Sequence, residues 1–245
     1  MEASTGRPKS NEGSFALRDA QPLSAAGRRV VVRSGKRALD LVVSGLTLLV
    51  LLPVLLALAA LVRLESPGPS FIRCSRVGYR GRPLRMLKFR KMVCDAAGAP
   101  LTTADDDRFT RLGRWLTKYK LDELPQLWHV LKGEMSLVGP RPESPDFVKR
   151  YAADYHDRIL TVRPGIIGLS QIAFAEENRV LDADDPVGHY VRRILPQKVN
   201  LDCIYATRLS LGLDARIIFW ATVTVLLRRR VAVHRETVMM TLRRR

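Results

Sequence analysis

The 245-residue chain carries 41 Lys and Arg against 24 Asp and Glu, a formal net charge of +17, and 47% of its residues are apolar. This apolar share is ordinary for a folded protein and excludes a wholly disordered chain. The excess of positive charge predicts an anionic partner: nucleic acid, an anionic membrane face or a phosphorylated substrate.

The cysteines and histidines form no recognisable metal or disulfide pattern. Cys74, Cys94 and Cys203 lie far apart without a Cys-x-x-Cys pair, which argues against a disulfide framework and favours a reducing compartment. The four histidines show no His-Glu-x-x-His or comparable spacing. A zinc site is therefore not expected.

The N-terminal part contains an apolar run long enough to cross a membrane. Residues 1–27 show little apolar periodicity and no signal-peptide pattern, so we predict a disordered arm. Residues 28–37 are basic, and Leu41–Val62 contains no charged residue. A straight helix of that length reaches about 33 Å, which is enough for a bilayer core.

Two features of this run argue against a simple crossing. Pro53 lies inside it, where it removes a backbone hydrogen bond and bends or breaks a helix. Basic residues also flank both ends, which places both ends on the cytoplasmic side. A re-entrant hairpin of two helices, Leu41–Leu52 and Val54–Val62, satisfies both features. A single-span anchor kinked at Pro53 remains the alternative from charge and proline alone.

The remainder predicts an α-rich mixed α/β fold. Short strands are expected over Phe71–Val77 and Pro83–Phe89, joined by a turn at 78–82. Residues 96–107 and 182–188 are predicted as loops, and Arg163–Phe174 as an extended segment. Helices are expected over Arg108–Lys118, Asp122–Leu131, Pro145–Thr161, Val187–Ala206 and Asp214–Arg230.

The C-terminal part favours a membrane surface. Ile217–Leu227 is apolar and too short to span, which predicts an interfacial helix. Residues 228–245 hold seven Arg and one Glu, which favours anionic phospholipid. We expect four parts: an arm (1–27), a basic flank with the re-entrant hairpin (28–65), a cytoplasmic catalytic domain (66–212) and an interfacial amphipathic helix with an Arg-rich tail (213–245).

The segment Leu121–Pro142, LDELPQLWHVLKGEMSLVGPRP, carries the strongest chemical signal. Asp122 suits a helix N-cap, where the positive helix end favours a carboxylate. An ionised Asp binds Mg²⁺ or attacks phosphorus, and Glu123 beside it can orient a group or exchange a proton. Taken alone, an Asp-Glu pair at a helix start is an ordinary capping feature.

Cations on tight turns surround this pair in the sequence. Gly139-Pro140-Arg141-Pro142 fixes two φ angles around Arg141, which suits a phosphate clamp. Lys88 and Arg90 lie at the end of a predicted strand, and Arg163 again precedes a proline. Each has an ordinary alternative, as a helix-ending turn or a charged strand edge. Together they predict a polyphosphate site beside a membrane.

The chain resembles a known family along roughly residues 36–232. The motifs are KRALDLVVSGLTLLVLLPVLLALAALVRLESPGPSFI, MLKFRKM, LDELPQLWHVLKGEMSLVGPRP and RPGIIG, in that order. They resemble the bacterial monotopic phosphoglycosyl transferases, which start exopolysaccharide, O-antigen and glycoprotein glycan assembly. The short N-terminal arm resembles the minimal catalytic form, without the preceding transmembrane helices of larger relatives.

The resemblance implies a reaction and its partners. A sugar-1-phosphate would pass from a nucleotide diphosphate sugar, expected to be a UDP-sugar, to undecaprenyl phosphate, with release of nucleoside monophosphate. Asp122 would attack the β-phosphate to give a phosphosugar–aspartyl intermediate, Glu123 would assist, and Mg²⁺ near Asp122 would neutralise the diphosphate. It also implies the re-entrant hairpin and the cytoplasmic face of the bacterial inner membrane. A homodimer is left open.

Several residues depart from the family pattern, and these leave the donor sugar and the glycan pathway open. Three single positions differ: Leu52 stands where Ser is common, Lys91 where Ser or Thr is common, and Ile167 where Thr is common. Thr117 stands where many members have a basic residue, and Lys118 and Lys120 beside it are basic instead. The segment Gln171–Arg179 lacks the Gly-Arg-Asn element of some members.

A second hypothesis is a non-catalytic, basic, membrane-anchored scaffold or binding protein. The charge of +17 and the Arg-rich tail favour it. Aromatic residues make up only 7% of the chain, and they do not alternate with basic clusters. Because no nucleic-acid-binding motif is present either, a nucleic-acid partner is not expected.

Overall fold

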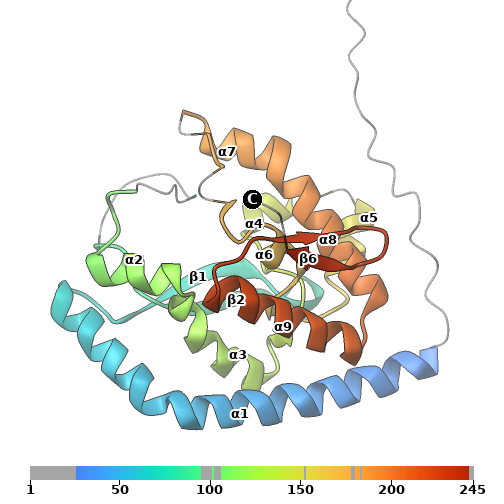
Figure 1. Ribbon diagram of the computed structural model, residues 1–245, viewed down its shortest axis with the longest axis horizontal. Helices are drawn as coiled ribbons and strands as arrows, with labels where there is room; N and C mark the ends of the chain where they lie inside the picture. The colour runs from blue at the N-terminus through green and yellow to red at the C-terminus, as the bar shows by residue number, and fades with distance from the viewer. Residues whose placement is uncertain are drawn as a thin grey trace, which may run out of the picture.

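The computed structural model describes residues 26–94, 101, 106–151, 153–177, 180–182 and 184–242. Residues 1–25 of the predicted arm, most of the loop 96–107, Asn178 and Arg179 of the segment 171–179, and the last three arginines lie outside the described residues. Within them the chain forms a mixed α/β domain that lies along one long N-terminal helix (Figure 1).

The N-terminal helix α1 runs from Ala26 to Glu65 and includes Pro53. Figure 1 shows that it bends part-way instead of folding back on itself. The expected pair of separate helices, Leu41–Leu52 and Val54–Val62, is therefore corrected to one bent helix: the proline removes one helical hydrogen bond, and the turns on either side continue. Among the described residues, Ser34–Glu65 is the one stretch that is long and apolar enough to cross a membrane.

Polar side chains tie the N-terminal half of α1 to the domain. Lys36 Nζ donates to Asp214 Oδ2 at 2.5 Å. Asp40 Oδ2 accepts a hydrogen bond from Ser136 Oγ at 2.7 Å. Asp40 Oδ1 accepts another from the backbone N–H of Leu137 at 3.1 Å. These residues are buried, so this part of α1 belongs to the folded domain.

The C-terminal end of α1 is tied to the same domain. Glu65 Oε1 accepts a hydrogen bond from the backbone N–H of Leu112 at 2.8 Å. Ser70, which follows the helix, donates from Oγ to the carbonyl of Ala59 at 2.7 Å. Both ends of the apolar stretch therefore meet one domain.

The predicted hairpin is confirmed. Strands β1 (Phe71–Val77) and β2 (Pro83–Phe89) pair antiparallel from Phe71 opposite Phe89 to Val77 opposite Pro83. The turn between them contains the 3-10 segment Tyr79–Gly81. Alternation along β2 buries Leu84, Met86 and Lys88 on one face, so a cation at the end of this face points into the protein.

The remaining elements are short and closely packed. Strands β3 and β4 pair in parallel, and β5 and β6 pair antiparallel. The elements are α2 (Arg111–Lys118), the 3-10 helix η2 (Leu121–Gln126), α3 (Leu127–Lys132), β3 (Ser136–Val138), α4 (Pro145–Val148), α5 (Ala153–Ile159), β4 (Gly165–Ile167), α6 (Leu169–Ala173), α7 (Pro186–His189), the π-helix η4 (Tyr190–Ile194), α8 (Leu195–Arg208), α9 (Leu211–Leu226), β5 (Val231–Val233) and β6 (Met240–Leu242).

Three of the sequence-based expectations are corrected by these elements. The helix expected over Pro145–Thr161 is divided into α4 and α5. The segment expected to be extended, Arg163–Phe174, is a strand only over β4 and then turns into α6. Residues 231–242, expected as a tail, form the β5–β6 hairpin, whose Val231, Val238 and Met240 are buried.

One apolar core joins the hairpin, α3, α6, α8 and α9. Its fully buried members include Val130, Met135, Leu169 and Ile217. A smaller cluster packs Leu55, Leu58 and Val62 of α1 against Phe89 and Leu116. Ile217 and Ala221 face the core from α9, and Phe219 on its other side is exposed. One side of α9 therefore packs on the domain, and the other side is open to the surroundings.

Candidate active site

Asp122 and Glu123 lie in the 3-10 helix η2, between α2 and α3. Lys120 precedes it in the left-handed region with φ 57° and accepts the backbone N–H of Glu123 at 3.2 Å. The expected role of Asp122 as helix N-cap is therefore wrong, because the helical turn starts before it. Pro125 disfavours the α conformation of the residue ahead of it, which favours the tighter turn.

Asp122 is almost fully buried, with 2% of its surface exposed. Its Oδ2 lies 3.6 Å from Lys91 Nζ. Its Oδ1 has no hydrogen-bond partner within the described part of the chain. A buried carboxylate oxygen without a partner is costly in a folded protein. Asp122 Oδ1 is therefore the acceptor of the site that is available to a ligand.

Glu123 is held by two cations. Its Oε1 lies 2.7 Å from Lys88 Nζ and 3.6 Å from an Arg141 guanidinium nitrogen. Burial alone would raise the pKa of Glu123, but Lys88, Arg141 and Lys120 outweigh it and hold that pKa well below its usual range. Glu123 is therefore ionised at neutral pH.

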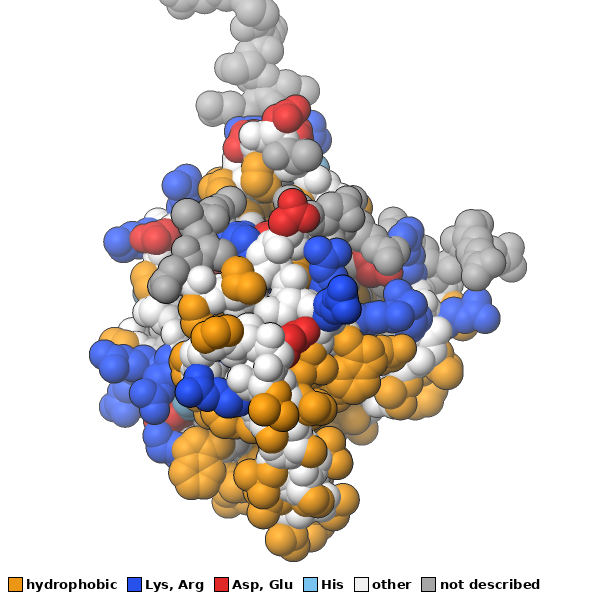
Figure 2. Space-filling model, turned by 90° about the vertical axis from the view of Figure 1, so that its left-hand side faces the viewer, with side chains coloured by type: hydrophobic (Ala, Val, Ile, Leu, Met, Phe, Trp, Pro, Cys, Tyr) orange, Lys and Arg blue, Asp and Glu red, His pale blue; other side chains and the backbone are white. Residues whose placement is uncertain are grey.

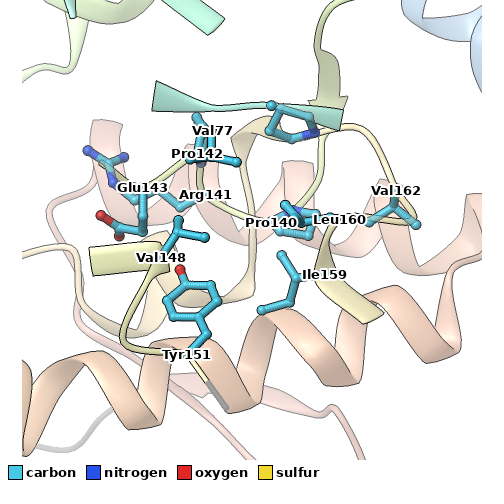
Figure 3. Close-up of a pocket in the computed structure, with 12 residues that line it drawn as sticks. Val77, Pro140, Arg141, Pro142, Glu143, Val148, Tyr151, Ile159, Leu160 and Val162 are labelled. Atoms are coloured by element: carbon cyan, nitrogen blue, oxygen red, sulfur yellow. The ribbon is translucent and has the colours of Figure 1, made fainter. Parts of the chain in front are cut away.

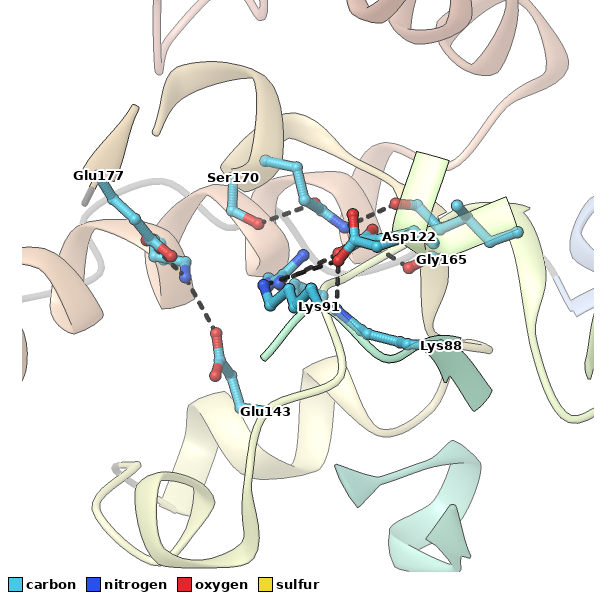
Figure 4. Close-up of polar contacts among 12 residues, drawn as sticks. Lys88, Lys91, Asp122, Glu143, Gly165, Ser170 and Glu177 are labelled. Carbon is cyan, nitrogen blue, oxygen red and sulfur yellow. Dashed lines mark hydrogen bonds and ion pairs between the residues drawn. The ribbon is translucent and has the colours of Figure 1, made fainter. Parts of the chain in front are cut away.

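The charges converge from three segments. Lys88, at the end of β2, contacts Glu123, and Lys91, just after it, lies near Asp122 (Figure 4). Arg141 reaches Glu123 from the Pro-Arg-Pro turn after β3. Burial would lower the pKa of Arg141, but Glu123, Glu143 and Glu177 raise it. The predicted grouping of Lys88 and Arg141 around Asp122-Glu123 is thus what the structure shows.

The Pro-Arg-Pro turn is fixed by the parallel pairing of β3 and β4. The backbone N–H of Gly139 donates to Ile167 O at 2.9 Å, and that of Gly165 donates to Pro140 O at 2.8 Å. A Cβ on Gly165 would stand 2.1 Å from Gly139 N, so the two backbones approach too closely for a side chain. In Figure 3 the charged ends of Arg141 and Glu143 point away from the apolar side chains packed under the turn.

The structure does not bring Arg90 to the acidic pair. Its guanidinium donates to the carbonyls of Val62, at 3.0 Å, and Ser66, at 2.6 Å, and also to that of Pro67. Arg90 is 3% exposed. It therefore closes the C-terminal end of α1, where carbonyls lack helical partners. The expected contact of Arg90 with phosphate stays a prediction.

Arg163 also has neighbours of its own. Its Nε donates to Gly133 O at 2.8 Å, and its guanidinium lies 5.5 Å from the centroid of the Tyr79 ring. These contacts hold the loop after α3 against the β1–β2 turn. The expected contact of Arg163 with substrate phosphate stays a prediction.

A buried polar network behind Arg141 escaped the sequence analysis. Lys198 Nζ lies 3.1 Å from Glu143 Oε1 and 3.0 Å from Glu177 Oε2, and the two glutamates are labelled in Figure 4. Tyr190 Oη donates to Glu143 Oε1 at 2.9 Å. Burial alone would lower the pKa of Lys198, but Glu143 and Glu177 outweigh burial, and the pKa lies above its usual value. Lys198 is thus a buried cation that keeps two carboxylates together.

Asp202, one helical turn further along α8, completes this network. Its Oδ2 accepts the backbone N–H of Arg141 at 3.3 Å, and its Oδ1 is buried without a partner among the described residues. Burial raises the pKa of Asp202 to about 7. Lys198 and Asp202 had no signal in the sequence, because both look like ordinary residues of an amphipathic helix.

The residues present fit a divalent cation of the Mg²⁺ type. Among the described residues, no group of three or more Asp, Glu, His or Cys side chains is arranged to hold an ion. Mg²⁺ in nucleotide-handling sites takes one or two carboxylates together with substrate phosphates and water. The unpartnered Oδ1 of Asp122 would be a carboxylate donor of such a site.

Comparison with known proteins decides the family. A family model described as bacterial sugar transferase matches residues 31–229. The chain belongs to the bacterial sugar transferase family. This confirms the resemblance that the sequence motifs indicated, and it places the acidic pair, Lys88 and Arg141 inside the matched region.

Named relatives are similar at 36% to 39% identity. The UDP-N-acetylgalactosamine-undecaprenyl-phosphate N-acetylgalactosaminephosphotransferase of Aeromonas hydrophila is 39% identical over 196 residues, which is 78% of this chain and 43% of that protein. The UDP-glucose:undecaprenyl-phosphate glucose-1-phosphate transferase of Caulobacter vibrioides is 39% identical over 199 residues, 78% of this chain and 69% of that protein. The exopolysaccharide production protein PSS of Rhizobium leguminosarum bv. phaseoli is 36% identical over 202 residues, 79% of this chain and 96% of that protein. The chain thus spans less than half of the Aeromonas relative.

Proposed function

We propose that the chain transfers a sugar-1-phosphate from a UDP-sugar to undecaprenyl phosphate and releases UMP. The observation that carries the proposal is the buried Asp122 next to Glu123, whose carboxylate is in contact with Lys88 and Arg141. The names of the Aeromonas and Caulobacter relatives specify a UDP-sugar donor and undecaprenyl phosphate as acceptor, and the Rhizobium relative takes part in exopolysaccharide production.

Asp122 is the proposed nucleophile. One of its oxygens forms a bond to the β-phosphorus of the donor, the bond from that phosphorus to the bridging oxygen breaks, and its electron pair leaves with UMP. The phosphate of undecaprenyl phosphate then attacks the phosphosugar–aspartyl intermediate and restores the carboxylate. Mg²⁺ held at Asp122 would supply charge neutralisation for the diphosphate.

Glu123 acts as an anchor for cations. Because Lys88 and Arg141 hold its pKa low, Glu123 is a poor proton donor at neutral pH. Its carboxylate fixes the two cations at the mouth of the site, where they meet the donor phosphates. The buried pairing removes side-chain freedom before the donor binds, which is the preorganisation that phosphoryl transfer requires.

The membrane assignment rests on α1 and its neighbours. The outward side of α1 exposes large apolar side chains, including Leu49 and Val50 at 70% each. Trp115 of α2, Trp128 of α3 and Phe219 of α9 are exposed as well. Figure 2 shows hydrophobic side chains over the lower part of the molecule and Lys and Arg above them. This distribution suits the cytoplasmic face of the bacterial inner membrane with anionic phospholipid.

The proposal keeps the re-entrant topology, with α9 lying in the interface. Lys36 and Asp40 on one side of the apolar stretch, and Glu65 on the other, bond to the same domain. A helix that crossed the bilayer would separate these contacts by the membrane thickness, about 30 Å. The bend in α1 lets the apolar stretch enter the lipid while both ends stay with the domain.

The catalytic proposal is tested with purified protein in nanodiscs that contain undecaprenyl phosphate. UDP-glucose and UDP-N-acetylgalactosamine are offered with Mg²⁺, and UMP release is measured. Asp122→Asn is expected to lose at least about 10³-fold in rate, and the donor alone should leave a phosphosugar on Asp122 of the native protein, detectable by mass spectrometry. The matched control Asp146→Asn removes an exposed carboxylate, 85% accessible, and keeps full activity. Full turnover by Asp122→Asn would refute the mechanism.

The topology is tested with single cysteines at Ser34 and Ser75, both exposed, in a chain without its own cysteines. An impermeant maleimide should label both positions in inside-out vesicles and neither in spheroplasts. Labelling of the two positions from opposite sides would show that α1 crosses the membrane.

A further inference from the structure

Lys91 occupies a fixed place beside the acidic pair that no part of the proposed mechanism uses. Its backbone carbonyl accepts the N–H of Thr110 at 3.1 Å, where α2 begins. A Cβ on Gly113 of α2 would stand 1.9 Å from Lys91 O. The helix therefore packs directly on the Lys91 backbone, and this contact sets where the side chain starts.

The Lys91 side chain runs from this anchor toward Asp122. Its ammonium lies 3.6 Å from Asp122 Oδ2 and 5.5 Å from the centroid of the Phe109 ring. Its side chain keeps 22% of its surface exposed, against 3% for Asp122. The Lys91 side chain is thus more accessible to a ligand from solvent than the carboxylate that it faces.

The contact of Lys91 is looser than that of its neighbour. Lys88 forms a hydrogen-bonded pair with Glu123 at 2.7 Å. The 3.6 Å separation between Lys91 and Asp122 is longer than a hydrogen bond, so the ammonium keeps donors for another anion. Lys91 therefore has bonding capacity left for a ligand.

We propose that Lys91 is a catalytic residue that binds the β-phosphate of the donor, and that its ammonium moves from Asp122 to the phosphoryl oxygens as the first step proceeds. The proposal rests on the transferase function above and assigns one more residue to its site. When Asp122 forms its bond to phosphorus, the carboxylate loses its negative charge and the departing nucleoside monophosphate gains it. Lys91 only donates hydrogen bonds in this step and transfers no proton, so the step needs no further reactant.

This assignment makes a specific prediction about nucleotide affinity. A hydrogen bond to a charged group contributes about 1.5–3 kcal/mol, equivalent to roughly 10- to 100-fold in affinity. Lys91→Met is therefore expected to bind UDP roughly 10-fold or more weakly than the native protein. UMP lacks the β-phosphate, so the affinity for UMP should change little. A general disturbance of the site would weaken both nucleotides together.

The experiment is isothermal titration of the detergent-purified full chain with UDP and with UMP, each with Mg²⁺ and with EDTA. Lys149→Met is the charge-matched control, since Lys149 is 78% exposed. Lys91→Arg should restore UDP binding, because a guanidinium also donates to phosphate. The loss for Lys91→Met should persist in EDTA, since the contact is direct.

The outcomes separate clearly. Equal affinity of Lys91→Met and Lys149→Met for UDP overturns the proposal, as does an equal loss for UDP and UMP or a loss confined to Mg²⁺. Failure of Lys91→Arg to recover UDP binding also counts against it. Failure of the proposed function would appear elsewhere, as full turnover by Asp122→Asn, and leaves the UDP titration interpretable.

Discussion

Replacing Asp202 with Asn should stabilise the protein at alkaline pH and do so less at acidic pH. The carboxyl group of Asp202 is 3% exposed, and burial raises its pKa from 3.8 to about 7. Between these values the unfolded chain has released the proton while the folded protein retains it, so folding stability falls as pH rises from about 4 to about 7 and is level above. An amide carries no charge and escapes this cost.

The magnitude follows from the pKa difference. At ~1.4 kcal/mol for each tenfold change, the cost of ionising Asp202 is ~4 kcal/mol at pH 8 and ~2 kcal/mol at pH 5. The advantage of Asp202→Asn should therefore shrink by ~3 kcal/mol between pH 8 and pH 5. The Asn carbonyl can still accept the Arg141 N–H, so any fixed cost of the amide is the same at both pH values.

The assay is thermal unfolding followed by tryptophan fluorescence in one detergent at pH 5, 6, 7 and 8. Asp146→Asn, an exposed carboxylate, is the control and should follow the native curve. A difference between Asp202→Asn and native protein that does not change with pH would refute the reasoning, because it would mean that Asp202 titrates alike in the folded and unfolded chain.

Three further substitutions test the buried contacts. Lys88→Met removes the 2.7 Å partner of Glu123 and leaves Arg141, at 3.6 Å, as its remaining cation, so unfolding should be easier by about 1–3 kcal/mol; denaturant titration measures this, and Lys88→Met with Glu123→Gln should recover much of the loss. Arg90→Lys removes hydrogen bonds to the end of α1 and should cost about 1–3 kcal/mol, seen as faster trypsin cleavage with unchanged UDP affinity; lower UDP affinity would return Arg90 to the site. Asp40 accepts hydrogen bonds from Ser136 Oγ and from the backbone N–H of Leu137, one with each carboxylate oxygen. Asp40→Asn keeps only one of these two acceptors and should lower the unfolding temperature by several degrees. An unchanged unfolding temperature would show that α1 is held by other contacts.

The parts of the fold that the sequence predicted are those set by neighbouring residues. The β1–β2 hairpin has its expected bounds because alternation and a glycine-containing turn are local signals. Asp122 and Glu123 were found because they are adjacent. Their conformation was not, since an N-cap and a 3-10 turn differ only in the backbone of Lys120, and a left-handed lysine has no sequence signal.

The parts that could not be predicted depend on contacts distant in sequence. Arg90 and Lys88 lie two residues apart, so the local sequence predicted the same phosphate-binding role for both. The carbonyl of Val62 at the end of α1, 28 residues before Arg90, accepts from the Arg90 guanidinium, while Lys88 contacts Glu123. The pairing of Tyr190 with Glu143 spans 47 residues, and the three-residue strand β4 forms only because β3 lies beside it. Short elements of this kind depend on tertiary packing more than on local propensity.

The bonds that tie α1 to the domain also set an order of events during synthesis. Asp40 meets Ser136 after 96 further residues, and Lys36 meets Asp214 after 178. At about 5–20 residues per second, the apolar helix leaves the ribosome roughly 10–40 s before its last polar partner exists. Asp40 gains its partner before Lys36 does, so the attachment of α1 is complete only when the C-terminal helix α9 brings Asp214 to Lys36. A chain truncated before Asp214 should therefore still reach the membrane and keep the Asp40 contact, but its Lys36 would lack the Asp214 carboxylate.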